Sequence, residues 1–468
     1  MTSTPRVITP NTHLSDTRDR ILLSFDGGGI RGYWNLLTLQ HLMQVIRNLE
    51  LAQDESIRSG FRPCEMPDNF SHLNDHAEFT PFLLFHYFDY MGGTSTGTHT
   101  YSTLITILLC RFHMTVEDCL KEVFHKMNIF MRQNNYDRKN LEMAVREVIE
   151  RRVQVRIKDD TEPLLQDEID TCRGVVLAMS LARLTRPENI RRFMFRSYIP
   201  YSEKRRVNAQ SALDSKNSIL RNPGEGMRTP LLKVALAGTA APFYFGHYHT
   251  VLSIAQAQAA NCHLLEGKSS HRVENAGFST DNNPCWELRR EIQYHHGDII
   301  KTITVSIGTA RPKYQLRAWK PEDVHEKLRE ERQLSYYRLR DEGEIEIEMD
   351  EWKPKRDGSN MIAQIETGFV RCLRQDGVED TFKQCASNLV QMRRDRMQTS
   401  RWGQFALGQY FACQVQHCPK DLDNRSLDRA DFENHLKHEH VEQDYEDLST
   451  SLEICRRVWK CRQRAAPS

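Results

Sequence analysis

The sequence predicts an α/β protein with a mostly parallel central sheet that helices cover on both faces. In residues 20–51, and again in residues 82–109, an apolar strand-like run leads through a glycine-containing turn into a stretch with helical spacing. The runs at 175–182, 191–198 and 302–309 predict further buried strands, with helical stretches between them. Strands that alternate with helices are typical of parallel sheets, because each connection crosses one face of the sheet.

The remaining elements follow in order along the chain. Residues 1–19 are polar and predict a flexible arm, and the apolar run from residue 20 leads through glycines into a helix over 33–51. Residues 52–79 are polar and predict an insertion, and helices are expected at 116–131 and 141–151. Residues 321–356 are highly charged and predict a solvated excursion, in which the alternating EIEIEM of 344–349 forms an exposed strand or hairpin arm.

Composition restricts the class of protein and of partner. The chain has 468 residues, of which 39% are hydrophobic and 27% charged, as in globular proteins. Its 64 basic and 63 acidic residues give a net charge of +1, so we do not expect nucleic acid as a partner of the whole chain. The sequence shows neither the apolar core of a signal peptide nor a run of about 18 apolar residues. This predicts a cytoplasmic protein, or alternatively a nuclear one, with reduced thiols.

A candidate nucleophile lies in the second strand-turn-helix unit. Gly93-Thr94-Ser95-Thr96-Gly97 matches the pattern G-x-S-x-G, in which the serine occupies a sharp turn between a strand and a helix. The two glycines let neighbouring backbone pass without a Cβ clash. The pattern alone is common, but here it follows an apolar run and precedes an apolar helix, as the mechanism requires.

The glycine loop of the first unit is a candidate anion site. Residues 26–32 read Asp-Gly-Gly-Gly-Ile-Arg-Gly, and consecutive glycines before a helix direct several backbone N–H groups toward one point. That point suits a phosphate or the oxyanion of an acyl-transfer intermediate, and Arg31 adds a positive charge beside it. The loop matches neither common nucleotide-binding glycine pattern, which favours the oxyanion role.

Five segments in a fixed order resemble the patatin-like phospholipases, particularly the fungal kind. They are DGGGIRG, GTSTG, TAAPFYF at 239–245, NAGF at 275–278 leading to NNP at 282–284, and VSIGT at 305–309. The resemblance spans residues 20 to about 312. It implies a three-layer α/β/α fold, calcium-independent cleavage of acyl esters in lipids, and a Ser–Asp dyad in place of a Ser–His–Asp triad.

The same resemblance implies the roles of individual residues. Ser95 would be the nucleophile, between the motif glycines Gly93 and Gly97. The oxyanion loop would consist of Gly27, Gly28, Gly29 and Arg31. An α/β-hydrolase triad with a later histidine as base is the competing arrangement. The glycine loop before the serine and the Asn-Asn-Pro segment after it favour the dyad.

The chain departs from the family at the second member of the dyad. Asn275 occupies the expected aspartate position, and the spacing to Asn-Asn-Pro is one residue longer than usual. An amide can hydrogen-bond Ser95 but cannot accept its proton, and general-base help is worth about 10²–10⁴-fold. Three interpretations stay open. In the first, Glu274 or Asp281 serves as the base. In the second, the hydrolase is slowed or inactive and is kept for lipid or protein binding. In the third, this segment aligns differently with the family motif, and Asn275 is not the dyad position.

Two cysteines and two histidines near the C-terminus form a candidate metal site. Cys413-x4-Cys418 is followed after 16 residues by His435-x4-His440. The pattern resembles a divergent fungal two-Cys/two-His zinc finger, with the cysteines on a hairpin and both histidines on one face of a helix. Four such ligands let Zn²⁺ fold a short segment with little core of its own.

Alternatives remain for this module and its surroundings. His417 or His438 could replace one ligand, or the segment is a charged helix with incidental Cys and His. A single zinc finger is more often a structural or protein-contact module than a sequence-specific DNA-binding module. The arginine-rich stretches 393–401 and 456–464 leave a role with nucleic acid or an anionic membrane open.

Together these observations divide the chain into four parts. They are a flexible arm (1–19), a patatin-like acyl hydrolase domain (20–400), a zinc-finger-like module (401–445) and a basic tail (446–468). We expect a calcium-independent phospholipase or lipase that acts on a lipid or membrane surface, holds structural zinc, and contacts a protein partner through the finger. The rival is a catalytically weak or inactive patatin-fold protein that acts as a lipid-binding or protein-interaction module.

Overall fold

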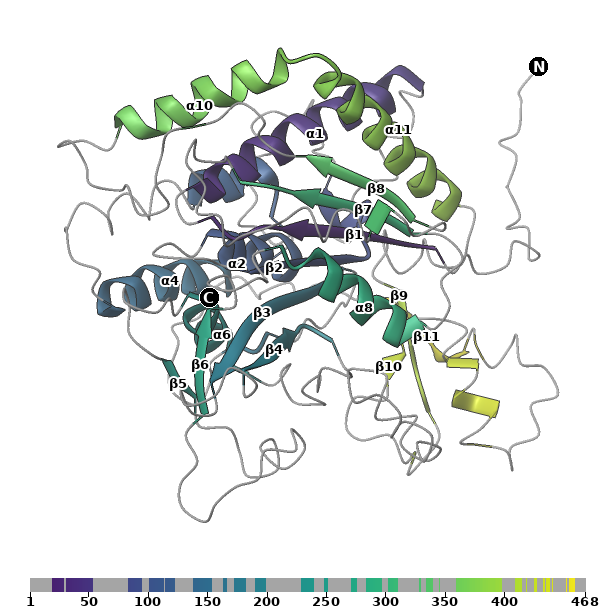
Figure 1. The fold of residues 1–468 in the computed structure, drawn as a ribbon. Helices are drawn as coiled ribbons and strands as arrows, with labels where there is room; N and C mark the ends of the chain where they lie inside the picture. Colours follow the sequence, from purple (N-terminus) through teal and green to yellow (C-terminus); the bar gives the residue numbers. More distant parts are fainter. Residues whose placement is uncertain are drawn as a thin grey trace, which may run out of the picture.

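Eight strands form one sheet at the centre of the molecule, in the order β5-β6-β3-β2-β1-β7-β8 with β4 paired to β3 (Figure 1). The strands are β1 (Arg20–Phe25), β2 (Tyr90–Thr94), β3 (Arg173–Leu181), β4 (Ile190–Arg196), β5 (Tyr248–Thr250), β6 (His271–Asn275), β7 (Thr302–Ile307) and β8 (Leu334–Leu339). Strands β3, β2, β1, β7 and β8 are parallel. Strands β4 and β6 pair antiparallel with β3, and β5 pairs antiparallel with β6.

The structure is a computed structural model, and it describes most of the sheet, its helices and the centre of the C-terminal module. The described residues are 19–28, 31–53, 83–94, 101–112, 114–122, 138–153, 163–165, 172–181, 190–198, 229–239, 248–250, 271–275, 283–296, 302–309, 328–329, 334–339, 345, 359–397, 409–414, 418, 425–426, 432–433, 435–437, 440, 452 and 454–458.

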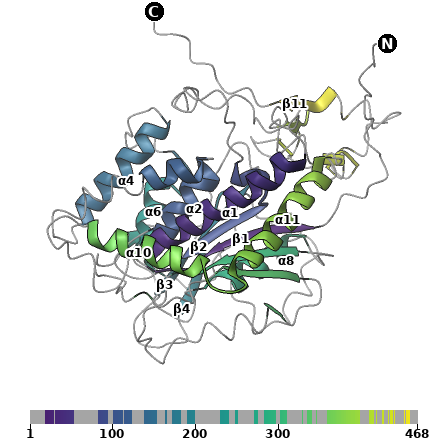
Figure 2. The same ribbon diagram turned by 90° about the horizontal axis from the view of Figure 1, so that it is seen from above.

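Helices cover both faces of the sheet, which gives a three-layer α/β/α architecture (Figure 1; Figure 2). One face carries α1 (Gly32–Gln53), α2 (Tyr101–Thr106), α4 (Arg138–Val153), α6 (Leu231–Thr239), α10 (Ser359–Leu373) and α11 (Val378–Met397), and the other carries α8 (Cys285–His296). Side chains alternate along a strand, so Ile21 and Leu23 pack under the first group while Leu22 packs under α8. None of the described helices is long and apolar enough to cross a membrane.

The predicted fold class is confirmed, and so are the strands near 175–182, 191–198 and 302–309 and the helix near 33–51. The apolar run from residue 82 is not a strand over its first described residues. Its described residues form a 3₁₀ turn, η4 (Leu84–His86), in which the His86 N–H donates to the Leu83 oxygen over 3.1 Å. The strand begins only at Tyr90, after Asp89 has accepted a hydrogen bond of 2.7 Å from the Ile21 N–H.

The charged segment 321–356 is not only a surface excursion. Strand β8 lies within it and pairs in parallel with β7, and Tyr337 and Leu339 enter the core. Ile345, the described residue of the EIEIEM run, is 5% exposed and lies against Gly368 of α10. The prediction of an exposed arm is therefore wrong at this position, because the Ile345 side chain meets a helix rather than solvent.

Two arginines of the first arginine-rich stretch are buried and paired within the described part of the protein. Both Arg393 and Arg396 on α11 are less than 3% exposed. Arg393 forms a two-pronged ion pair with buried Glu50 of α1, at 2.7 and 2.8 Å, and Arg396 pairs with buried Asp89. These two arginines fasten α11 onto α1 and the start of β2, so they contact no nucleic acid or membrane.

A second, three-stranded sheet forms the C-terminal module, in the order β10-β9-β11. Its strands are β9 (Gln409–Ala412), β10 (Arg425–Ser426) and β11 (Arg456–Val458), all paired antiparallel. Strand β11 belongs to the segment that the sequence assigns to a basic tail. Leu452 and Cys455 also pack into the small core of this module, so its described part extends to Val458.

Candidate functional site

The two motif loops follow neighbouring strands at one edge of the sheet. Strands β1 and β2 run in parallel, and Phe25 at the end of β1 lies opposite Gly93 in β2. Residues 26–28 come directly after β1, and Ser95 is the next residue after β2 in the sequence. In open α/β sheets, ligands bind at the carboxyl ends of the strands. Ser95, Gly29, Gly97 and Asp281 themselves lie outside the described residues.

Hydrogen bonds tie the start of the glycine loop to both flanking helices. The Asp26 N–H donates to the Ile307 oxygen over 3.0 Å, which continues the pairing of β1 with β7. The Asp26 carbonyl oxygen accepts from Ser102 Oγ of α2 at 2.7 Å and from Asn35 Nδ2 of α1 at 3.3 Å. The same amide also donates to Ser102 Oγ over 3.2 Å. The loop after β1 and the helix that follows Ser95 therefore hold each other in place.

An ion pair fixes the Asp26 side chain. Arg338 at the end of β8 donates to Oδ1 and Oδ2 of Asp26 over 3.0 and 2.5 Å, and to Ser306 Oγ over 2.6 Å. Asp26 is fully buried and the Arg338 side chain is 7% exposed. Because this carboxylate is already held by a guanidinium, it is a structural anchor for the loop rather than a general base.

The thiol nearest to this ion pair is chemically inert. Cys285 is fully buried in the first turn of α8, where its N–H donates to Asn283 Oδ1 over 3.0 Å. Burial raises the pKa of the Cys285 thiol to about 12, although the charge of Arg338 acts in the opposite direction. The thiol is therefore protonated at neutral pH and is a poor nucleophile.

Glycine is required at two of the motif positions by close approach. A Cβ on Gly28 would lie 2.3 Å from the Thr309 side chain, which follows β7. A Cβ on Gly93 would lie 2.8 Å from the backbone oxygen of Ser102 in α2. Both contacts are closer than real Cβ atoms make, so the loop after β1 and the end of β2 pack directly onto their neighbours.

Arg31 shapes the loop through its own backbone. Its N–H and its Nε both donate to the Gly28 carbonyl oxygen, over 3.1 and 3.4 Å, and it is 6% exposed. The glycine loop thus turns directly into the first turn of α1. This contact holds the charge of Arg31 beside the loop.

The register of β3 brings the end of β6 to the end of β2. Residues 175–177 of β3 pair with both β2 and β4, and residues 178–181 pair with both β4 and β6. A strand has two edges and β4 follows one of them throughout, so β2 and β6 share the other. They run toward each other, and their last residues Thr94 and Asn275 pair with Leu177 and Ala178, which are consecutive in β3. Asn275, the last residue of β6, therefore lies at the same edge of β3 as Thr94, the last residue of β2.

In the C-terminal module, the four predicted metal ligands come together. The ligand atoms of Cys413, Cys418, His435 and His440 all lie within 4.8 Å of one another. Cys413 Sγ is 3.3 Å from His440 Nε2, and Cys418 Sγ is 3.5 Å from His435 Nε2. Tetrahedral Zn²⁺, with bonds of about 2.3 Å to sulfur and about 2.0 Å to nitrogen, requires S–N separations of roughly 3.5 Å. The four residues therefore fit a closed metal site.

A small apolar core supports this cluster. Phe411 of β9 stacks on Phe432 with ring centroids 5.5 Å apart, and Leu436, Leu452 and Cys455 complete the core. The His440 N–H donates to the Leu436 oxygen over 3.3 Å, as in a helix. Both histidines are buried, at 5% and 8% exposure. The described part of this core holds five residues beside the cluster, and a metal bound by the four ligands would link β9 to the helical turn that carries His435.

Comparisons with known proteins leave the family open. No protein-family model matches the chain, and no curated protein matches it significantly. One solved structure, VipD from Legionella pneumophila, is similar at a TM-score of 0.31 and 9% sequence identity, over 93% of this chain and 79% of that chain. A similarity this low carries no argument about function.

Three residues of the site are absent from the sequence prediction. Asn35, Ser102 and Arg338 hold Asp26, but none of them belongs to a motif. Arg338 lies 312 residues from Asp26, inside the charged segment. The signal that could have found it is the strand-like LSYYRL run, which places Arg338 at the same edge of the sheet as the glycine loop.

Proposed function

We propose that this protein is a patatin-like lipid acyl hydrolase in which Ser95 is the nucleophile. The observation that carries the proposal is the meeting of three strand ends at one edge of the sheet. The glycine loop follows β1, the G-x-S-x-G turn follows β2, and Asn275 ends β6 beside β2. This is the arrangement that a serine, an oxyanion loop and a dyad partner require.

The proposed chemistry is acyl transfer through the serine. Ser95 Oγ attacks the acyl carbonyl carbon of a lipid ester and forms an acyl-enzyme, and the lipid alcohol leaves with the serine proton. Water then attacks the acyl-enzyme, which releases the fatty acid and returns the proton to Ser95. Backbone N–H groups of the glycine loop stabilise the oxyanion, and the anchoring of Asp26 holds that loop rigid. No calcium is needed for these steps.

A second candidate function is lipid or protein binding without efficient catalysis. The specific observation in its favour is that the residue at the end of β6 is an asparagine, which cannot accept the serine proton. In that case the fold keeps the site but lacks a base, because neither Glu274 nor Asp281 takes the role of the missing aspartate.

A fluorophosphonate probe distinguishes the two candidates. Labelling of the wild type, together with none in Ser95→Ala, is expected for an activated serine. Ser102→Ala is the matched control, since Ser102 Oγ is buried and donates to Asp26. Its labelling should fall without vanishing. If a folded wild type is not labelled at all, the hydrolase proposal fails and the binding function stands.

We further propose that the metal of the C-terminal cluster is zinc and that its role is structural. Two thiolates and two imidazoles within 4.8 Å suit tetrahedral Zn²⁺, and no position is left open for a substrate. The purified protein is therefore expected to hold about one zinc ion per chain. The surface of this module is the proposed contact for a protein partner.

A further inference from the structure

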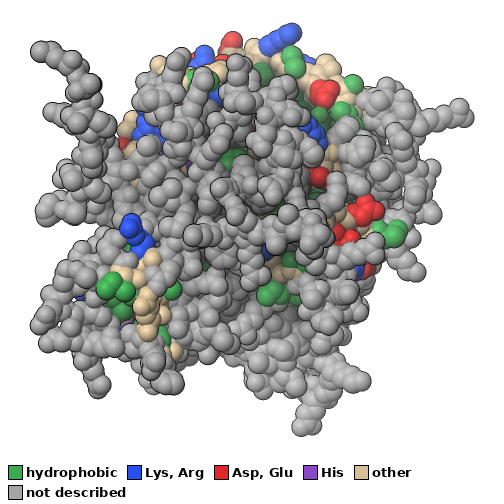
Figure 3. Space-filling view, turned by 180° about the vertical axis from the view of Figure 1, so that it is seen from behind, with side chains coloured by type: hydrophobic (Ala, Val, Ile, Leu, Met, Phe, Trp, Pro, Cys, Tyr) green, Lys and Arg blue, Asp and Glu red, His purple; other side chains and the backbone are tan. Residues whose placement is uncertain are grey.

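The two cysteines of the C-terminal cluster are more exposed than its two histidines. Cys413 and Cys418 are half-buried, whereas His435 and His440 are buried. The described part of this module reaches the molecular surface at the lower left of Figure 3. A small molecule from solvent therefore reaches the sulfur atoms of the cluster more easily than its imidazoles.

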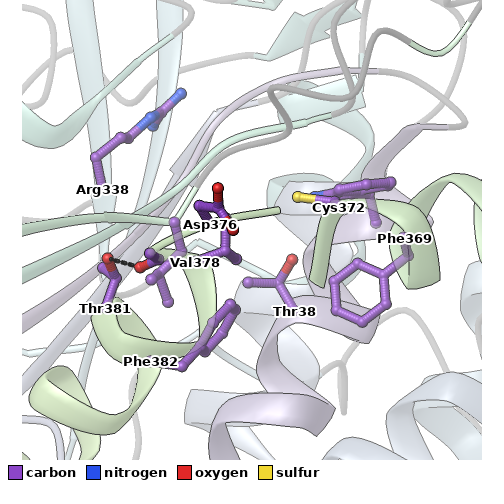
Figure 4. A pocket seen from close by; sticks show the side chains of 11 residues that line it. Thr38, Arg338, Phe369, Cys372, Asp376, Val378, Thr381 and Phe382 are labelled. Atoms are coloured by element: carbon purple, nitrogen blue, oxygen red, sulfur yellow. Dashed lines mark hydrogen bonds between the residues drawn. The ribbon is translucent and has the colours of Figure 1, made fainter. Parts of the chain in front are cut away.

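The other described cysteines are protected by burial. Cys372 lines a pocket between α1, α10 and α11, yet it is only 3% exposed (Figure 4). Burial raises the pKa of the Cys285 thiol to about 12, and it raises the pKa of the Cys385 thiol as well. The reactive form of a cysteine is the thiolate, and a cysteine that binds zinc does so as a thiolate. Among the described cysteines, Cys413 and Cys418 thus combine access from solvent with the reactive form.

These two cysteines are also close enough to bond to each other. Their sulfur atoms lie within 4.8 Å of one another, and a disulfide joins two sulfur atoms at about 2.05 Å. Cys413 directly follows β9, and Cys418 comes five positions later in the chain. A disulfide that closes so short a loop costs little chain entropy.

We propose that Cys413 and Cys418 form a redox switch, in which hydrogen peroxide oxidises the pair to a disulfide and the zinc ion is released. This inference rests on the zinc proposed above for the cluster. Each thiolate gives up one electron, the S–S bond forms as the O–O bond of the peroxide breaks, and the two oxygen atoms take up two protons and leave as water. The zinc–sulfur bonds break at the same time, because a disulfide sulfur no longer carries the negative charge that binds the metal.

The switch would act on the surface that we propose as a contact for a protein partner. Oxidation removes the link that the metal makes between β9 and the helical turn that carries His435. Since binding of a structural metal is coupled to folding, the oxidised module loses its fixed shape and with it the contact. A thiol reductant together with zinc restores both, because a disulfide between two accessible cysteines is reducible.

Treatment of the full chain with excess hydrogen peroxide tests the proposal. The reduced wild type should hold about one zinc ion per chain, and peroxide should release it, as measured with a chromogenic zinc chelator. Residues 402–420 form one tryptic peptide that contains both cysteines. Mass spectrometry should show this peptide lighter by two hydrogen atoms after oxidation. A thiol reductant with added zinc should restore both its mass and the metal content.

Two variants distinguish the disulfide from general oxidative damage. Cys418→His keeps four ligands but a single thiolate, so it should hold its zinc under the treatment that empties the wild type. Cys372→Ala removes a buried cysteine of α10 and should release zinc as the wild type does. If Cys418→His holds no zinc when reduced, the peptide map of the wild type decides the question alone.

Each possible result has a definite reading. A reduced wild type without zinc would remove both the zinc proposal and the switch. Zinc that stays bound after peroxide treatment would leave the zinc proposal standing and overturn the switch. The switch is also overturned if zinc leaves without a disulfide, or if Cys413 instead pairs with Cys455, which belongs to the core against which Cys413 packs.

Discussion

At the scale of single residues, the proposed chemistry depends on Asn275. The end of β6 brings this residue beside the last residue of β2, which directly precedes the proposed nucleophile Ser95 in the sequence. An asparagine there keeps the shape and hydrogen-bonding capacity of an aspartate but lacks the basic oxygen. The nearly isosteric substitution Asn275→Asp therefore tests whether the missing base limits the rate of hydrolysis.

We predict that Asn275→Asp raises the hydrolysis of a short-chain ester by about 10²-fold or more, because it restores a proton acceptor beside Ser95. Asn48→Asp, on an exposed turn of α1, adds the same charge far from the site and should leave the rate unchanged. If Glu274 or Asp281 already acts as base, the gain is small and replacing that residue abolishes activity. An active wild type that is indifferent to all three changes contradicts this placement of the base.

The residues that the sequence could predict are those whose role lies in a local pattern. Gly28 and Gly93 stand in motifs, and the structure shows why a larger side chain does not fit at either position. The four metal ligands were also predictable, because their spacing reflects one hairpin and one helix. Arg338 was not, because it lies 312 residues from Asp26 and meets it only through the packing of the strands. Asn35 is nine residues from Asp26, but nothing in its local pattern marks it as a partner of the loop.

At the scale of elements, strand β11 decides where the C-terminal module ends. Its three residues pair antiparallel with β9, so that Arg456 lies opposite Phe411. Leu452 and Cys455, just before it, belong to the same core as Phe432. A boundary at residue 445 would remove all of these contacts while leaving the four metal ligands in the chain.

We predict that a chain ending at residue 445 binds zinc much more weakly than one ending at residue 458. The shorter chain keeps its ligands but loses the strand and the side chains that hold β9 in place. Metal analysis after dialysis against a mild chelator measures the difference. Cys413→Ser in the longer chain is the control for loss of a ligand. Equal zinc content in both chains would show that β11 has no part in the module.

Several elements escaped prediction because their patterns are short or mixed. Strand β8 reads LSYYRL within a highly charged segment, and β11 reads RRV. Their burial comes from neighbours supplied by other parts of the chain, which a local pattern does not contain. The 3₁₀ turn η4 shows the opposite error, because its sequence was predicted to be a strand. Leu84 and Phe85 are apolar because they are buried, and a buried turn is as apolar as a buried strand.

At the scale of the whole molecule, buried ionisable groups limit the pH range of the fold. Tyr87 donates to Glu50, and Tyr198 donates to Glu291, each over 3.0 Å. Burial, together with these carboxylates, raises the pKa of both tyrosines well above 10.0. The folded state thus holds their protons more tightly than the unfolded state. The stability from this source is complete below pH 10 and is lost as the pH rises above it.

We predict that the free energy of unfolding falls steeply above pH 10, with each of these tyrosines contributing about 1.4 kcal/mol per pH unit to the slope. Tyr87→Phe should make the slope shallower by that amount. It should still fold at neutral pH, because Glu50 keeps Arg393 and Arg394 as partners. Urea unfolding followed by circular dichroism at several alkaline pH values measures this. An unchanged slope in Tyr87→Phe would contradict the assignment.

The ion pairs of α11 also have a consequence for how the protein is made. Arg393 follows its partner Glu50 by 343 residues, and Arg396 follows Asp89 by 307. At about 5–20 residues per second, a ribosome needs roughly 17–70 s to synthesise the interval between Glu50 and Arg393. Until then, the nascent chain must keep Glu50 and Asp89 in water, because burying either carboxylate alone is too costly. The native burial of these two carboxylates is therefore completed only after α11 has emerged from the ribosome.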